Sequence, residues 1–217
     1  MIQVCPNCNA EIKESMLSSN MLIPKNKTDT INKLLDSSVK DYCQKCIKTI
    51  KEVAKGELQK KVETNKKNLR NSLNSVPIVT SQDPQKWDYD TLGIVTGQST
   101  TGTGFISELK SDITDFFGLQ SRSYNKKIRS GEQVCYSQIR QETLELGGNA
   151  IIAVDIDYSE AGSLKGMLMV CVSGTAVKVN NFSELDTNLN AQITKAIQAQ
   201  QNLTFLQKAD SELMLAY

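Results

Sequence analysis

The sequence contains no histidine among its 217 residues. This absence excludes Ser/His/Asp and Cys/His nucleophile systems, and with them every catalytic zinc site that uses a histidine ligand. No apolar run is long enough to span a membrane, and the opening residues MIQVCPNC contain no apolar stretch of the kind found in signal peptides. We therefore expect a cytoplasmic protein with no membrane span. Because the sequence contains no recognisable catalytic constellation, we also expect that the protein is not an enzyme.

A strong charge imbalance is also missing, because 25 Lys and Arg residues stand against 24 Asp and Glu residues, for a formal net charge of +1. The whole chain therefore lacks the basic character of a dedicated nucleic-acid binder. Its length is sufficient for one sizeable domain and a second, smaller domain held together by a metal.

Two short cysteine pairs are the most informative feature that is present. Each pair has the CxxC spacing, and together they supply four thiolates: Cys5, Cys8, Cys43 and Cys46. Four thiolates from two tight turns are the ligand set of a closed structural zinc site. We predict Zn²⁺ at these cysteines, in a zinc-ribbon-like module over residues 1–46 that carries a helical insert between the pairs.

Three other interpretations of the pairs remain open, namely disulfides, a redox motif and iron. Thiols stay reduced in the cytoplasm, where paired CxxC motifs indicate a metal more often than a disulfide. A redox CxxC is expected once, at the turn between a strand and a helix, rather than twice around a polar insert. Iron can use the same four ligands as zinc.

Helical periodicity follows within and after the zinc module. Thr28 or Asp29 is predicted to cap the inserted helix, whose apolar residues include Ile31 and Val39. A thin apolar stripe then predicts a long, exposed, basic helix over residues 47–75. Its lysines can attract a phosphate backbone or can simply form a solvated surface; those singled out as nucleic-acid candidates are Lys48, Lys51, Lys55, Lys60 and Lys61.

Residues 76–90 contain two prolines and several small polar residues, which predict a linker. Residues 91–180 predict a mixed domain: a strand at 92–97, a Gly/Thr loop at 98–104, and helices at 105–117 and 124–146. Strands at 150–158 and 167–179 should form an antiparallel hairpin. Residues 181–217 predict a helical tail, capped at Ser183, that buries its apolar face on this domain, on the long helix or on a neighbouring copy.

The hairpin carries the remaining candidate site. Strand alternation places Asp155 and Asp157 on one face, where they can hold a hard cation, act as an acid and a base, or meet solvent or a neighbouring subunit. On the next strand, Cys171 shares a face with Met167 and Met169, in a row that suits a thiophilic metal or an ordinary core.

The stretches LGGNAIIAVDIDY and GMLMVCVSGTAVKV, preceded by GIVTG, resemble the YbjQ-like family over about residues 92–179. The resemblance implies a small α/β domain with a curved antiparallel sheet, in bacterial proteins that assemble into homopentameric rings and whose label concerns heavy-metal binding. It does not extend to the cysteine pairs or to the tail.

The sequence as a whole predicts an α+β protein composed of a zinc-binding module, a long helix, a YbjQ-like domain and a C-terminal helix. We expect a non-enzymatic assembly protein whose homo-oligomeric core displays zinc modules to a protein partner. Heavy-metal binding or sensing is the alternative. Nucleic-acid binding through the zinc module and the lysine-rich helix is a weaker one.

Overall fold

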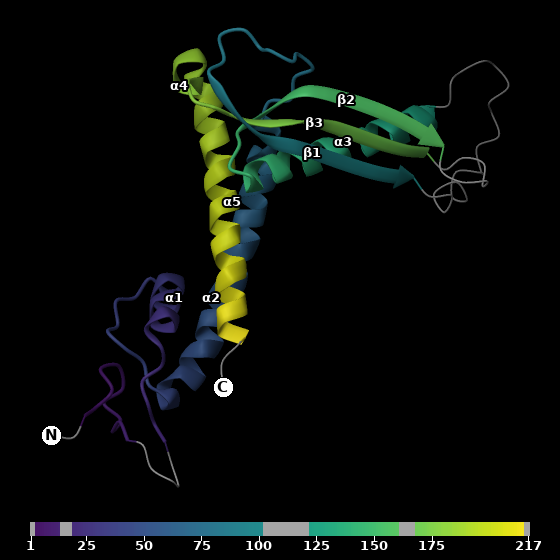
Figure 1. The fold of residues 1–217 in the computed structure, drawn as a ribbon. Coiled ribbons are helices and arrows are strands. Elements are labelled where there is room, and N and C mark those ends of the chain that lie inside the picture. Colours follow the sequence, from purple (N-terminus) through teal and green to yellow (C-terminus); the bar gives the residue numbers. More distant parts are fainter. Residues whose placement is uncertain (1–2, 14–18, 102–121, 161–167, 215–217) are drawn as a thin grey trace. The chain divides into compact units, whose positions relative to one another are not determined.

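The computed structural model describes residues 3–13, 19–101, 122–160 and 168–214. The chain divides into two compact units. The terminal unit contains residues 1–67 and 201–217, and the central unit contains residues 68–200. Two long helices cross the division: α2 (Gln44–Ser72) and α5 (Thr187–Met214) (Figure 1).

Helix α1 (Lys25–Leu35) is the insert between the two cysteine pairs. It begins after Pro24, several residues earlier than the predicted caps, and Thr28 lies buried inside it. It ends at Leu35, and its C-cap Asp36 adopts the left-handed conformation with φ of 50°, so Val39 lies beyond the helix. Ile31 and Leu34 are completely or almost completely buried and join α1 to the core of the terminal unit.

Helix α2 confirms the predicted long helix and starts at the second cysteine pair. Apolar residues recur every three or four positions and bury one stripe, with Ala54 fully enclosed and Leu58 at 7% exposure. On the solvent-exposed side of the helix, ion pairs between residues three positions apart stabilise the helical conformation. They join Lys55 to Glu52, Lys60 to Glu57 and Lys66 to Glu63. The helix leads into a short 3-10 turn, η1 (Leu73–Ser75).

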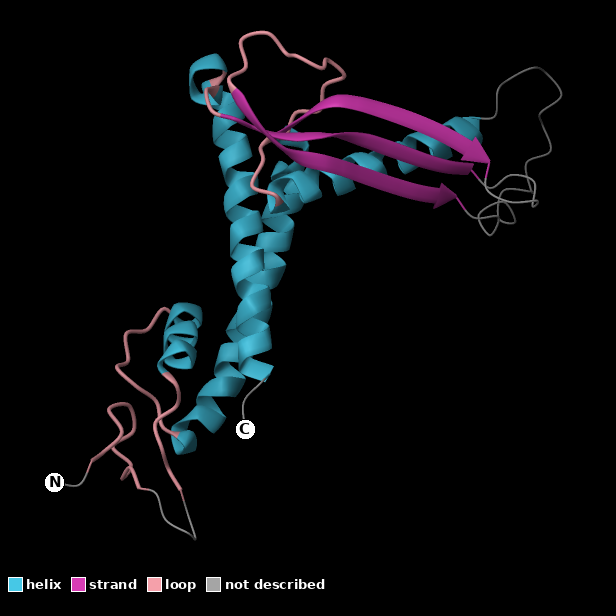
Figure 2. Ribbon diagram, in the orientation of Figure 1, coloured by secondary structure: helices cyan, strands magenta, loops and turns pink. Residues whose placement is uncertain are grey.

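The central unit contains a three-stranded antiparallel sheet in the order β1-β3-β2 (Figure 2). The strands are β1 (Tyr89–Thr101), β2 (Ala150–Glu160) and β3 (Leu168–Val179). The predicted hairpin is therefore confirmed. The earlier strand is also confirmed but extends to Thr101, so residues 98–101 of the predicted Gly/Thr loop pair with β3 instead. Residues 102–121 and 161–167, which include the predicted helix at 105–117 and Met167, lie outside the described residues.

Helix α3 (Arg122–Glu145) lies against one face of this sheet. Its contact is close at Cys135, whose thiol donates to the carbonyl of Val170 at 3.4 Å. The helix ends at Glu145. Beyond it, Gly147 has φ of +84°, and the N–H groups of Gly147 and Gly148 donate to the carbonyls of Leu144 and Thr143. This hydrogen-bond pattern is a Schellman motif, in which glycine supplies the left-handed residue.

Both outer strands have polar groups attached to their free edges. On β1, the side chains of Glu142 and Gln138 accept the N–H groups of Thr96 and Gln98. On β2, backbone hydrogen bonds join Ile151, Ala153 and Val154 to the segment 77–81. That segment belongs to the predicted linker, yet in the structure it runs along the sheet, because its carbonyl and N–H groups complete the β2 edge.

The tail forms two helices, α4 (Phe182–Leu185) and α5. The N-terminus of α5 is capped by Asp186, whose side chain accepts the N–H of Leu189 at 2.8 Å, so the expected cap at Ser183 is replaced by one at Asp186. The first part of α5 buries Ile193 against the sheet, next to a T-shaped contact between Trp87 and Phe182. The last part belongs to the terminal unit.

Gly97 allows α3 to approach β1. A Cβ atom at this position would lie 2.5 Å from the carbonyl oxygen of Cys135 and 2.9 Å from its Cα, and backbone atoms in a helix cannot move aside. We predict that Gly97→Ala lowers the free energy of unfolding of the central unit by roughly 1–3 kcal/mol, because the helix must shift away from the strand.

Denaturant unfolding measures this change. Gly93→Ala on the same strand is the control, since its added Cβ would meet nothing within 4 Å. Equal stability of the two variants would contradict the proposed close approach.

Candidate metal centre

The first cysteine pair lies in a tight turn near the start of the chain. The N–H of Cys5 donates to the carbonyl of Ala10, and the carbonyl of Cys5 accepts the N–H of Asn9. Asn9 has φ of 57°, a left-handed conformation that asparagine tolerates better than most residues. This turn buries Cys5 completely and leaves Cys8 exposed.

The second pair lies where α2 begins. Cys43 directly precedes the helix and pairs with Leu22 through an isolated bridge, and Cys46 lies in the first helical turn. Cys43 is fully buried, while Cys46 is partly buried. Two ligands are therefore held at the N-terminus of a 29-residue helix, where the helix dipole favours negative charge.

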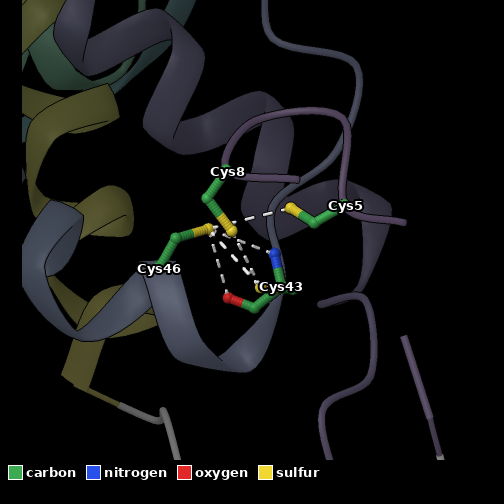
Figure 3. A group of neighbouring side chains, drawn as sticks. All are labelled: Cys5, Cys8, Cys43 and Cys46. Carbon is green, nitrogen blue, oxygen red and sulfur yellow. Dashed lines mark hydrogen bonds between the residues drawn. The ribbon is translucent and has the colours of Figure 1, made fainter. Parts of the chain in front are cut away.

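The structure brings all four cysteines together, as the sequence predicted, with every Sγ atom within 4.8 Å of the others (Figure 3). The Sγ–Sγ distances are 3.9 Å for Cys5 and Cys46, 3.6 Å for Cys8 and Cys43, and 3.7 Å for Cys43 and Cys46. A regular tetrahedron with Zn–S bonds of about 2.3 Å has edges of about 3.8 Å. The donor set and its spacing therefore fit a tetrahedral metal ion.

The same distances do not fit a disulfide. A disulfide requires sulfur atoms about 2.05 Å apart, and all six cysteines of the sequence are free thiols in the structure. The two separate cysteine pairs instead converge on one point, where a single metal ion could bind all four sulfurs.

The thiols of Cys8, Cys43 and Cys46 differ in their affinity for protons. Burial opposes ionisation of Cys43, but hydrogen bonds from the backbone of Cys46 and from the Cys8 side chain outweigh it and lower the pKa of Cys43 to about 6. Burial raises the pKa of Cys46 to about 12. At Cys8 a backbone hydrogen bond from Ala10 lowers the pKa. Desolvation and hydrogen bonds with the thiols of Cys43 and Cys5 together raise the pKa by more, so the net shift is upward.

Asn20 links the two halves of the centre. Its side chain is 1% exposed, donates to the carbonyl of Glu11 at 2.7 Å and accepts the backbone N–H of Lys45 at 3.1 Å. Glu11 follows the first cysteine turn, and Lys45 lies inside the second pair. Asn20 was not among the residues expected from the sequence, because a single asparagine in a polar stretch has no pattern that marks it; only its burial identifies it.

The second candidate group, Asp155, Asp157 and Cys171, lies on the sheet face opposite α3. Asp157 and Cys171 are direct cross-strand partners, and Asp155 is opposite Ser173. Both aspartates are exposed and Cys171 is half-buried. Within the described part of the chain, the four-cysteine set is the one group of three or more His, Cys, Asp or Glu residues close enough to hold a metal, so these three residues share a face without forming such a group.

The lysines proposed for nucleic-acid binding lie on α2, and several are already paired. Lys55 and Lys60 contact glutamates on the same helix, and Lys61 contacts Asp36 at 2.9 Å. Such exposed pairs contribute little stability, but they neutralise the charge that would attract phosphate. Of the five, Lys48 and Lys51 have no ion pair among the described residues.

Comparison with a family model supports the predicted resemblance of the central segment. Residues 76–180 match the family model YbjQ_1, described as "putative heavy-metal-binding", so this segment is a YbjQ-like domain, as its sequence predicted. A crystal structure of a Pediococcus pentosaceus protein of unknown function, from the DUF74 family, is similar at 14% identity and a TM-score of 0.32. The match covers 48% of this chain and 96% of that one.

The family description and the four-cysteine cluster both support metal binding. The cluster lies outside the matched segment. The family description names no reaction. No helix in the described ranges combines the length and the apolar character needed to cross a bilayer.

Metal binding should release protons from the centre. Cys8 and Cys46, whose pKa values are raised, are protonated at pH 7 and must lose their protons to become ligands. We predict release of at least two protons per metal ion, and an affinity that falls as pH is lowered, more steeply below about pH 6 where Cys43 also becomes protonated. Calorimetric titration of metal-free protein in buffers of different protonation enthalpy measures this number, and release of no protons would contradict it.

Loss of the Asn20 side chain should weaken metal binding without removing a ligand. We predict that Asn20→Ala lowers the affinity by roughly tenfold, the effect expected when a residue that positions metal ligands is lost. Competition with a chromophoric chelator gives the affinity. Asn71→Ala, at an exposed position on α2, is the matched control, and equal affinities for the two variants would show that Asn20 does not position the second pair.

Proposed function

We propose that this chain is a non-enzymatic zinc-binding assembly protein, in which a homo-oligomeric YbjQ-like core displays zinc modules to a protein partner. The observation that carries the proposal is the convergence of four thiols at tetrahedral spacing in a unit separate from the YbjQ-like domain. The four ligand atoms of this site are all sulfur. Sites of four cysteines are structural rather than catalytic, because no coordination position stays open for a substrate.

Zinc is favoured over other metals by the ligand set. Four thiolates select soft or borderline ions, and zinc holds them without redox chemistry in a tetrahedral arrangement. Iron uses a similar geometry, so the identity of the metal is part of the test below. When bound, the ion supplies the crosslink between the N-terminal turn and the start of α2, and residues Cys5, Cys8, Cys43 and Cys46 hold it.

Oligomerisation would give the zinc module its effect. A single small module offers limited surface to a partner, but several copies carried by one core bind through effective concentration, which can raise avidity by a factor of roughly 10²–10⁴. The family resemblance implies a ring of five copies. The absence of histidine and of a recognisable catalytic group in the sequence supports a binding role over an enzymatic one.

Heavy-metal binding or sensing by the central unit is the second candidate, and the description of the matching family favours it. Its site would use Cys171 with Asp157 on the open sheet face, where the two residues are cross-strand partners. A thiolate beside a carboxylate accepts cadmium or copper. Nucleic-acid binding is a weaker candidate, because only Lys48 and Lys51 of the proposed lysine set lack an ion pair within the described ranges.

Native and denaturing mass spectra of the same preparation test the proposal, because together they give the number of subunits and the metal content of each chain. We expect an assembly of five chains with one zinc ion per chain. Cys5→Ser should lose the metal and keep the assembly, whereas Cys171→Ser should keep both.

Other results would redirect the assignment. A metal-free monomer would overturn both the zinc site and the assembly. A second metal ion per chain after addition of cadmium, lost in Cys171→Ser, would favour the heavy-metal candidate, and iron in place of zinc would change the cofactor but not the site.

A further inference from the structure

The core beside the metal centre is built from both ends of the chain. Residues of the zinc module and of α2 enclose it together with three residues from the last part of α5; its buried members are Ile23, Ile31, Leu34, Tyr42, Ala54, Leu58, Leu206, Ala209 and Leu213. The three α5 residues are at most 5% exposed. A helix near the other end of the sequence therefore completes the apolar core of the metal-binding unit.

One of the metal ligands, Cys46, touches this core directly. Cys46 and Ile47 pack against it from the first turn of α2. Tyr42, which immediately precedes the ligand Cys43, is 2% exposed within it, and its hydroxyl donates to Asn32 at 3.0 Å. The position of the second cysteine pair is thus set by the packing of α2 and its neighbours rather than by a free loop.

Polar contacts fix the last part of α5 in the same place. The hydroxyl of Thr30 on α1 donates to Glu212 at 2.5 Å, and the Lys33 ammonium lies 4.2 Å from the centre of the Phe205 ring. The side chain of Asn202 on α5 also donates to the side chain of Asn65 on α2 at 3.0 Å. These contacts hold α5 against both α1 and α2, so its position is specific.

We propose that residues 201–213 of α5 act as positioning residues for the metal centre and set its affinity. With these residues docked, Cys43 and Cys46 are held ready for the ion. Without them, Tyr42, Ala54 and Leu58 lose their cover, the start of α2 loosens, and metal binding must also order the ligands, which lowers the measured affinity. The inference rests on the proposed metal binding by the four cysteines.

Coupling of this kind is reciprocal, because two events that favour the same state must favour each other equally. Metal binding should therefore also tighten the docking of the last part of α5. The metal state of the N-terminal module then controls how firmly an apolar stripe near the other end of the chain is covered. Leu206, Ala209 and Leu213 form this stripe.

Leu206→Ala in the full chain tests the first direction. We expect it to lower metal affinity about tenfold or more, measured by competition with a chromophoric chelator. Ile193→Ala is the matched control: it removes the same number of side-chain carbons from an equally buried position on the same helix, but in the central unit. Equal losses in both variants would show general destabilisation, and no loss in Leu206→Ala would overturn the inference.

A milder variant keeps the test valid if Leu206→Ala unfolds the terminal unit. Thr30→Val replaces the hydroxyl that donates to Glu212 with a methyl group, and it should lower metal affinity by a smaller factor while circular dichroism stays unchanged. Unchanged affinity in this folded variant would count against the inference.

Amide hydrogen exchange tests the reverse direction. In the wild-type chain, exchange within residues 201–213 should slow when zinc is added to metal-free protein. Cys8→Ser should abolish the change, because it removes an exposed ligand without touching the core. Absence of bound metal by mass spectrometry would refute the proposed function itself, whereas bound metal with unchanged exchange in 201–213 would refute this inference alone.

Discussion

The convergence of four thiols on one point is the feature on which the N-terminal module depends, because the module has little else to bury and a metal ion bound there would hold it together. Residues 1–43 contribute Ile23, Ile31, Leu34 and Tyr42 as buried core residues besides the cysteines. So small an apolar core supplies little stability by itself. A metal ion held by Cys5, Cys8, Cys43 and Cys46 would join segments up to 41 positions apart, and the free energy of that binding would become folding free energy.

The location of the centre at the start of α2 adds an electrostatic reason for the arrangement. Four thiolates around a divalent ion carry excess negative charge, and the helix N-terminus offers N–H groups and a positive dipole end. The first turn of α2 contains no acidic residue that would oppose this charge. The lowered pKa of Cys43 reflects the same environment, since hydrogen bonds from the backbone at the helix start stabilise its thiolate.

The central unit follows a different physical logic. Helix α3 covers one face of its sheet through close contacts at Gly97 and Cys135. The free strand edges are hydrogen-bonded to Glu142, Gln138 and the segment 77–81. Such edge caps oppose uncontrolled strand pairing with other chains. As far as the described residues show, the part of the other face that carries Asp155, Asp157 and the half-buried Cys171 is available for a ligand or for a neighbouring copy.

The sequence alone was sufficient for features that depend on local spacing. Two CxxC pairs predicted one four-sulfur site, the helical period predicted α2 and α3, and strand alternation predicted the hairpin with Asp155 and Asp157 on one face. Tertiary structure decided what depends on contacts between distant residues: the start of α1 at Lys25, the attachment of residues 77–81 to β2, the role of Asn20, and the docking of Leu206 beside the cysteines. The apolar stripe of α5 is continuous in sequence, and only packing determines that its first part completes one core and its last part another.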